Sequence, residues 1–165
     1  MAPVEPIRWL DDDELRAWRA LVICSSRLKA VLDAELMAKH DLPFGDYEVL
    51  VVLSEAPDRR MRMTELAEHL FLSPSGLTRR LDRLTRDGLV AREQCPFDRR
   101  GTFAVLTQQG FARLEQAAPC HLRGVREHFI DLLDREQLQE MGRALEAVAD
   151  ECPSRSPSNL RASAP

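Results

Sequence analysis

The chain has 165 residues, of which 44% are hydrophobic, 30% are charged and 5% are aromatic. This length and composition fit a single globular domain with enough apolar residues for a core, and they exclude collagen-like, disulfide-scaffolded and fully disordered chains. The formal net charge of −4 gives the whole molecule no preference for anionic partners, so a nucleic acid would need a local basic patch.

The N-terminal segment, residues 1–42, is predicted to consist mainly of one long helix. Asp11 with Glu14 three residues later forms a capping-box pattern. Apolar residues then recur mostly at three- and four-residue steps as far as Leu36, which predicts a helix of about 25 residues that ends near Pro43. A helix of this length in a short chain needs an apolar partner along its length.

The middle segment, residues 43–106, is predicted to begin with a helix over residues 44–56. A short alternating piece at residues 61–63 is expected to form a small strand. Thr64 is then expected to cap a short helix. A second short helix follows after a tight break.

Ser73 is predicted to cap this second helix, with Pro74 in the first turn, where its missing N–H has no cost. The helix is expected to bury Leu77 and Leu81 and to end at Gly88, a residue suited to helix C-termini. Two short helices separated by a tight break indicate a helix-turn-helix, whose second helix enters the major groove of DNA.

Two strands are predicted after this helix, at residues 89–93 and 102–106, with a polar turn between them. A hairpin that directly follows a helix-turn-helix is a two-stranded β wing. The two elements have complementary reach, because a helix fits the major groove of about 12 Å while a thin ribbon can place Arg in the minor groove of about 6 Å.

Arginine is concentrated in this part of the chain. Residues 59–100 carry ten basic residues, all of them Arg, and six acidic residues, for a net charge of +4, whereas residues 1–58 have a net charge of −6 and residues 101–165 a net charge of −2. The planar guanidinium suits phosphates and base edges. An Arg-rich composition that simply fills solvated helix faces is the alternative, since Arg outnumbers Lys 21 to 2.

The C-terminal segment, residues 107–152, is predicted to form a helix from Thr107 and a last helix that begins at an Asp134–Gln137 capping pattern. Residues 153–165 are rich in Ser, Pro and Ala and are expected to be disordered. The amphipathic helices of residues 1–42 and 107–152 are predicted to form the interface of a C₂ homodimer. A monomeric bundle is the alternative.

Specific sequence motifs resemble those of the MarR/SlyA family of bacterial transcriptional regulators. They are the run from Ser73 to Val90, the Asp98-Arg99-Arg100 tripeptide, and Leu106-Thr107 followed by Gly110. The resemblance covers roughly residues 10–150. It implies a mainly α fold, in which a winged helix-turn-helix domain is joined to long N- and C-terminal dimerisation helices. It further implies a homodimer on a pseudo-palindromic double-stranded DNA operator, with repression relieved by a small ligand or by oxidation.

Nine residues are predicted to contact DNA. Arg79 is assigned to direct base readout, because Arg with guanine is the commonest specific contact, while the short side chains at the start of the helix let the backbone approach the duplex. For Arg83 a solvated or backbone-facing position remains open. The resemblance implies that Asp98 orients a guanidinium and that Arg99 or Arg100 enters the minor groove. The full set is Ser73, Ser75, Gly76, Thr78, Arg79, Arg83, Asp98, Arg99 and Arg100.

The resemblance also implies a ligand pocket between the dimerisation helices and the DNA-binding lobe. Trp18, Arg19, Tyr47 and Phe111 are candidates to line it. Arg19 is available to an anionic aromatic compound. An ordinary core or surface position is the alternative for each of the four.

Other functional classes find little support in the sequence. The four cysteines form no CxxC pair, and no secretory leader or apolar run of about 20 residues is present, which predicts a reduced, cytoplasmic protein without a membrane span. Cys24 lies in the middle of the first helix and Tyr47 is the only tyrosine, which argues against the redox-sensing subclass of the family.

The four histidines share no metal-ligand spacing, and no catalytic or cofactor signature occurs. The protein is therefore predicted to be neither a metalloprotein nor an enzyme, and to need no cofactor. A winged-helix module that binds a protein partner instead of DNA is the remaining alternative.

Overall fold

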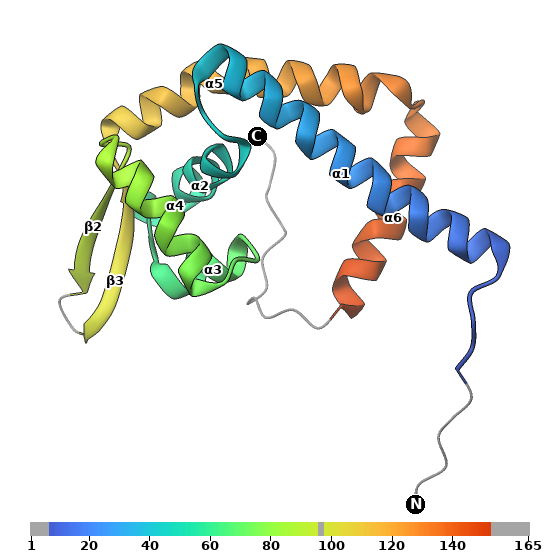
Figure 1. Cartoon of the computed structure of the whole chain (residues 1–165), viewed down its shortest axis with the longest axis horizontal. Coiled ribbons are helices and arrows are strands. Elements are labelled where there is room, and N and C mark those ends of the chain that lie inside the picture. Colours follow the sequence, from blue (N-terminus) through green and yellow to red (C-terminus); the bar gives the residue numbers. More distant parts are fainter. Residues whose placement is uncertain (1–6, 96–97, 153–165) are drawn as a thin grey trace, which may run out of the picture.

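Two long helices, α1 (Asp12–His40) and α5 (Gln108–His128), pack against each other and cross above a smaller lobe (Figure 1). The computed structural model describes residues 7–95 and 98–152, and this part of the chain is mainly helical. The lobe contains α2 (Phe44–Glu55), α3 (Met63–His69), α4 (Pro74–Arg86) and a small sheet. A last helix, α6 (Arg135–Glu151), turns back from the end of α5. The predicted fold class is confirmed.

The termini of the long helices follow the local sequence signals. The Asp11 carboxylate accepts hydrogen bonds from the backbone N–H groups of Asp13 and Glu14, and the Glu14 carboxylate accepts one from the Asp11 N–H in return. A second capping box joins Asp134 and Gln137 at the start of α6. Both boxes satisfy backbone donors that a helix start leaves free.

One predicted cap is wrong. Helix α3 begins at Met63, and its N-cap is Arg62, which makes no side-chain capping bond. Arg62 ends strand β1 (Arg60–Arg62) in an extended conformation, so the chain enters the helix directly from the strand. Thr64 consequently lies inside the helix, with an exposed side chain.

The wing consists of β2 (Val90–Cys95) and β3 (Asp98–Leu106), which pair antiparallel from Val90 opposite Leu106 to Gln94 opposite Thr102. Strand β1 adds a third strand at the base of the wing, in the order β1-β3-β2. The outer part of the hairpin extends beyond the lobe (Figure 1).

Leucines from the three lobe helices form the centre of the core. Leu50 and Leu53 of α2, Leu66 of α3, and Leu77, Leu81 and Leu84 of α4 each have at most 1% of their surface exposed. Helix α4 is therefore anchored along one side by residues at three- and four-residue spacing. Its opposite side is left to solvent.

The end of α4, the base of the wing and the start of α5 meet at Thr107. Its hydroxyl group lies 2.7 Å from the Gly88 carbonyl oxygen and 3.1 Å from that of Leu89, and it caps α5 by accepting a hydrogen bond of 2.9 Å from the Gly110 N–H. Gly110 packs so closely that a Cβ there would lie 2.0 Å from the Leu89 carbonyl oxygen. Only glycine fits at this position.

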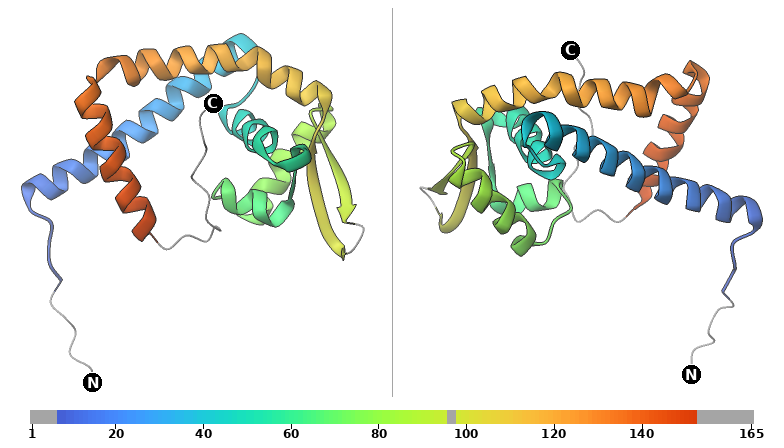
Figure 2. Two further views of the ribbon diagram at one scale, coloured as in Figure 1. Left: turned by 180° about the vertical axis from the view of Figure 1, so that it is seen from behind. Right: turned by 45° about the horizontal axis from the view of Figure 1, so that its top comes forward.

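Helix α6 and the N-terminal half of α1 project away from the lobe (Figure 2). Helix α6 contains no buried residue, and 42% of Leu145 and 58% of Val148 are exposed. On α1, Trp18 and Val22 are 58% and 43% exposed. The rest of the described chain leaves these apolar side chains largely open to solvent. No helix of residues 7–95 and 98–152 is long and apolar enough to span a membrane.

Candidate nucleic-acid interface

The N-terminus of α4 is exposed and polar. The Ser73 Oγ caps the helix by accepting a hydrogen bond of 3.1 Å from the Gly76 N–H, and the Thr78 hydroxyl donates to the Pro74 carbonyl oxygen at 2.8 Å. The Ser75 hydroxyl lies 3.2 Å from that of Ser73. These hydroxyl groups keep free lone pairs, and the positive end of the helix favours an anion such as phosphate.

The four arginines of α4 fall into two pairs. Arg79 and Arg86 are exposed and make no hydrogen bond or ion pair within the described part of the chain. Arg80 and Arg83 bind back to α2 instead. Six of the positions predicted to contact DNA belong to α4 or its N-cap. Five of them lie together at the start of the helix, at Ser73, Ser75, Gly76, Thr78 and Arg79. The guanidinium of the sixth, Arg83, is turned to α2.

Arg83 forms a two-pronged ion pair with Asp46, the only buried charged residue in the described part of the chain. Its Nε and a terminal nitrogen donate to the two carboxylate oxygens at 2.6 and 2.5 Å, and Asp46 is only 2% exposed. The hydrogen bond to Asp46 raises the pKa of Arg83. Arg80 adds a hydrogen bond of 2.8 Å to the Gly45 carbonyl oxygen. These contacts fix the orientation of α4 against α2.

Sequence reasoning missed Asp46. The available signal was that Asp46, with Glu48, is one of two carboxylates within the apolar run Phe44–Leu53, since a charge in such a run is rarely buried without a partner.

Several other arginines of the basic segment also have partners inside the protein. The guanidinium of Arg59 lies 3.6 Å from the ring centroid of Phe111, and that of Arg60 lies 4.9 Å from the centroid of Phe103. On β2, Arg92 donates to the Asp82 carboxylate of α4 at 2.7 Å. Part of the arginine segment thus holds the wing and the helices together.

The backbones of Asp98, Arg99 and Arg100 lie in β3, at the outer part of the wing. Their side chains lie outside the described residues. The predicted acid–arginine pair and the minor-groove arginine therefore remain predictions.

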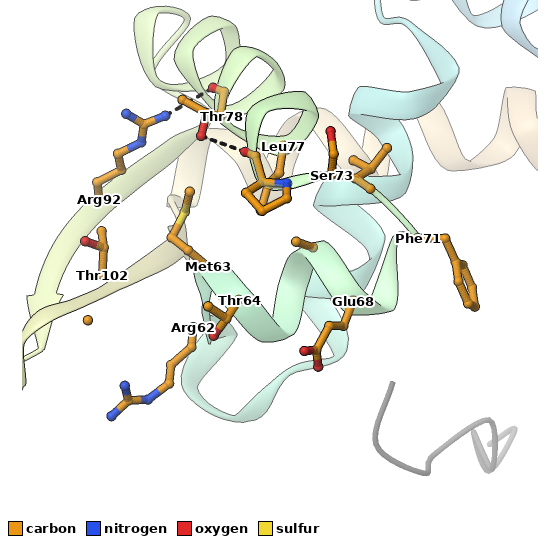
Figure 3. Close-up of a pocket in the computed structure, with 14 residues that line it drawn as sticks. Arg62, Met63, Thr64, Glu68, Phe71, Ser73, Leu77, Thr78, Arg92 and Thr102 are labelled. Atoms are coloured by element: carbon orange, nitrogen blue, oxygen red, sulfur yellow. Dashed lines mark hydrogen bonds between the residues drawn. The ribbon is translucent and has the colours of Figure 1, made fainter. Parts of the chain in front are cut away.

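A cavity of about 930 Å³ lies between α3, the start of α4 and the two wing strands (Figure 3). Met63, Leu72 and Leu77 give it an apolar lining, and Arg92 and Thr78 lie together at its edge. Phe71 also borders the cavity, with its ring directed away from the other labelled side chains. The cavity combines apolar surface with guanidinium and hydroxyl groups directly beside α4.

The four predicted ligand-binding residues do not come together within one chain. Trp18 and Arg19 are exposed on the projecting half of α1, whereas Tyr47 is 6% exposed and packs on the His121 ring at a centroid distance of 4.6 Å. Phe111 lies beneath Arg59. None of the four lines the cavity beside α4, nor a second one of about 700 Å³ between α1, α2, α4 and α5.

No group of three or more His, Cys, Asp or Glu side chains within residues 7–95 and 98–152 is arranged to hold a metal ion. His121 and His128 have separate surroundings. Burial lowers the pKa of His121, whose Nδ1 has no hydrogen-bond partner. His128 lies with its Nε2 2.7 Å from a Glu35 carboxylate oxygen, and this hydrogen bond lowers the pKa of Glu35.

A leucine-anchored second helix followed by a hairpin defines this chain as a winged helix-turn-helix protein. A family model described as the MarR family matches residues 40–101. The HTH-type transcriptional repressor YetL of Bacillus subtilis (strain 168) is 33% identical over 125 residues, which cover 74% of each chain.

Two solved structures from Streptomyces coelicolor are also similar. Sco3205, a MarR family transcriptional regulator in complex with DNA, is 38% identical with a TM-score of 0.85, and the match covers 93% of this chain and 96% of that one. AbsC, another MarR family regulator, is 43% identical with a TM-score of 0.81, and the match covers 87% and 97%. The chain belongs to the MarR family, whose members are transcriptional regulators rather than enzymes.

Proposed function

We propose that this protein binds a specific double-stranded DNA operator and represses transcription from it. Helix α4 would enter the major groove and the wing would lie in the adjacent minor groove. The observation that carries the proposal is the division of α4 into two sides, with Leu77, Leu81 and Leu84 buried while Ser75, Thr78 and Arg79 face solvent. The DNA complex of the similar protein Sco3205 supports it.

We further propose that the protein acts as a homodimer. The exposed apolar residues of α6 and of the N-terminal half of α1, among them Trp18 and Val148, support a second copy as their partner, because long amphipathic helices need a covered apolar face. Two-fold symmetry would place the two α4 helices on half-sites about one helical turn apart, on a pseudo-palindromic operator.

Replacing Arg79 tests the recognition role of α4. Arg79→Ala should weaken operator binding by about 1–3 kcal/mol and relax the sequence preference at one position of each half-site, while thermal stability stays unchanged because the side chain has no partner in the described chain. Arg126→Ala is the matched control, since its charge lies on α5 and pairs with Asp131 at 2.6 Å. An unchanged sequence preference in Arg79→Ala would refute the readout role.

The electrostatic part of the proposal is tested by salt. Operator affinity should fall steeply with salt concentration, because binding to several phosphates releases condensed counterions. An affinity that is the same at low and moderate salt would contradict it. A reporter gene placed behind the operator distinguishes repression from activation.

We also propose that a small ligand releases the protein from DNA, with anionic aromatic compounds as the first class to test. The four residues predicted for this role are separated within one chain, so the cavity beside α4 is the better candidate site. Its apolar lining with Arg92 at the edge suits an aromatic ring that carries an anion. Arg92→Met should weaken the release of DNA by such a compound in a gel-shift titration, and release that is unaffected would exclude this cavity.

The rival proposal, a module that binds a protein partner, is less favoured. It calls for a contiguous apolar surface at α4, but hydroxyl groups and Arg79 occupy the exposed start of this helix. Retention of genomic DNA fragments by the purified protein separates the two proposals.

A further inference from the structure

The turn between α3 and α4 contains a residue in an unfavourable conformation. Phe71 has a φ of 52°, in the left-handed region that glycine tolerates and residues with a Cβ rarely adopt. Backbone hydrogen bonds hold the turn on both sides, from the Phe71 N–H to the Glu68 carbonyl oxygen at 3.0 Å and from the Leu72 N–H to that of Ala67 at 2.8 Å. The fold therefore requires this conformation, and glycine would meet the requirement more easily.

The side chain of Phe71 contributes nothing to the core that would compensate for this strain. It is 81% exposed, whereas its neighbours Leu70 and Leu72 pack against the core. Figure 3 shows the ring directed away from the other labelled side chains that line the cavity. A strained backbone combined with an exposed aromatic ring indicates a residue that serves a contact outside the chain.

The place of Phe71 indicates what it contacts. It precedes Ser73, the N-cap of α4, by two residues, so it adjoins the end of the helix that carries the exposed hydroxyl groups and Arg79. The ring is a single exposed apolar group between polar residues, with Glu68 three residues before it and Ser73 two residues after it, which differs from the contiguous apolar patch of a protein-binding surface. On duplex DNA, the apolar groups available to such a ring are the 5-methyl group of thymine and the deoxyribose.

We propose that Phe71 is a DNA-contacting residue that adds specificity, by packing its ring against a thymine methyl group or the adjacent deoxyribose in each half-site. This inference rests on the proposed function, because it needs α4 to lie in the groove. It extends the recognition surface from α4 itself into the turn before it. The strain in the turn is then the cost of presenting the ring.

The test compares Phe71→Gly and Phe71→Leu with the unchanged full-length protein. The probes are operator fragments that the unchanged protein selects from a randomised DNA pool, each made with thymine and with uracil, which lacks the methyl group. Phe71→Gly removes both the ring and the strain, so its melting temperature should equal or exceed that of the unchanged protein. Its affinity for the thymine operator should nevertheless fall about five- to tenfold. Phe71→Leu keeps an apolar side chain and should lose less affinity than Phe71→Gly.

The uracil probe identifies the group contacted. If the ring packs on a thymine methyl, uracil should weaken the unchanged protein about as much as Phe71→Gly does, and should have no further effect on that variant. If Phe71→Gly loses the same factor in affinity relative to the unchanged protein on both probes, the contact is with deoxyribose, and this result also supports the proposal. Both variants binding both probes as the unchanged protein does would overturn it. Absence of salt-sensitive DNA binding by the unchanged protein would instead overturn the proposed function, and this inference with it.

Discussion

The ion pair between Asp46 and Arg83 leads to an asymmetric prediction for stability. Replacing Arg83 by Met leaves a carboxylate that is 2% exposed without its two hydrogen bonds, and the nearest remaining cation is the Arg80 Nε at 3.9 Å. Removing one partner of a buried pair costs 3–5 kcal/mol when the other charge stays uncompensated. Because Arg80 compensates in part, we expect Arg83→Met to lose about 3 kcal/mol.

The reverse replacement should cost much less. Asp46→Asn keeps one carbonyl acceptor, and the Arg83 side chain is 45% exposed, so water can solvate its charge once the carboxylate is gone. We expect a loss of about 1 kcal/mol, in the range of an ordinary hydrogen bond. The double variant should be no less stable than Arg83→Met alone, because the two residues act as one unit.

Urea unfolding at a fixed protein concentration measures all three variants, and the concentration must be constant because the proposed dimerisation would shift the apparent stability. Equal losses for the two single variants, or strictly additive losses in the double variant, would refute the reasoning. Either outcome would mean that Asp46 is hydrated in solution and that the ion pair does not fix α4 to α2.

Three further predictions concern the rest of the fold. Gly110→Ala should destabilise the protein by at least about 3 kcal/mol in urea unfolding, because the added Cβ would meet the Leu89 carbonyl oxygen. Gly142→Ala, where no atom lies within 4 Å of the added Cβ, should instead stabilise α6 by up to about 1 kcal/mol. Similar effects of the two substitutions would contradict the packing at Gly110. Burial lowers the pKa of His121 below its usual 6.5, so the unfolded state binds a proton that the folded state does not, and stability should fall as the pH decreases below about 6.5. His121→Phe should weaken this dependence in melting curves, and an unchanged dependence would exclude His121 as its source. Leu145→Asp combined with Val148→Asp should convert a dimer into a monomer in sedimentation experiments, because both residues are exposed on α6; a dimer that persists would place the interface elsewhere.

Local signals predicted the elements of this fold well, because each depends on residues close in sequence. The capping box at Asp11 and Glu14 and the Ser73-Pro74 start of α4 are examples, since both involve contacts within one turn of helix. The prediction for Thr64 is wrong because a cap also requires an extended residue at the junction, and β1 places Arg62 there. Strand pairing, which the local sequence does not reveal, decides that boundary.

Contacts between distant parts of the chain were less predictable. Arg83 reaches Asp46 across 37 positions, and helical periodicity gives the exposed side of α4 without showing which guanidinium finds a partner on a neighbouring helix. The same limit applies to the ligand-binding residues. Trp18 and Tyr47 suggest a crevice by residue type alone, and the distance between their helices depends on packing that the pattern does not encode.

The junction at Thr107 has a mechanical consequence for regulation. One hydroxyl group links the end of α4, the base of the wing and the first turn of α5, which leads toward α6. A tilt of that long helix would therefore carry helix and hairpin along as one rigid body. In the proposed homodimer, an effector would then change operator occupancy by altering the distance between the two α4 helices, while each helix-turn-helix and wing keeps its shape.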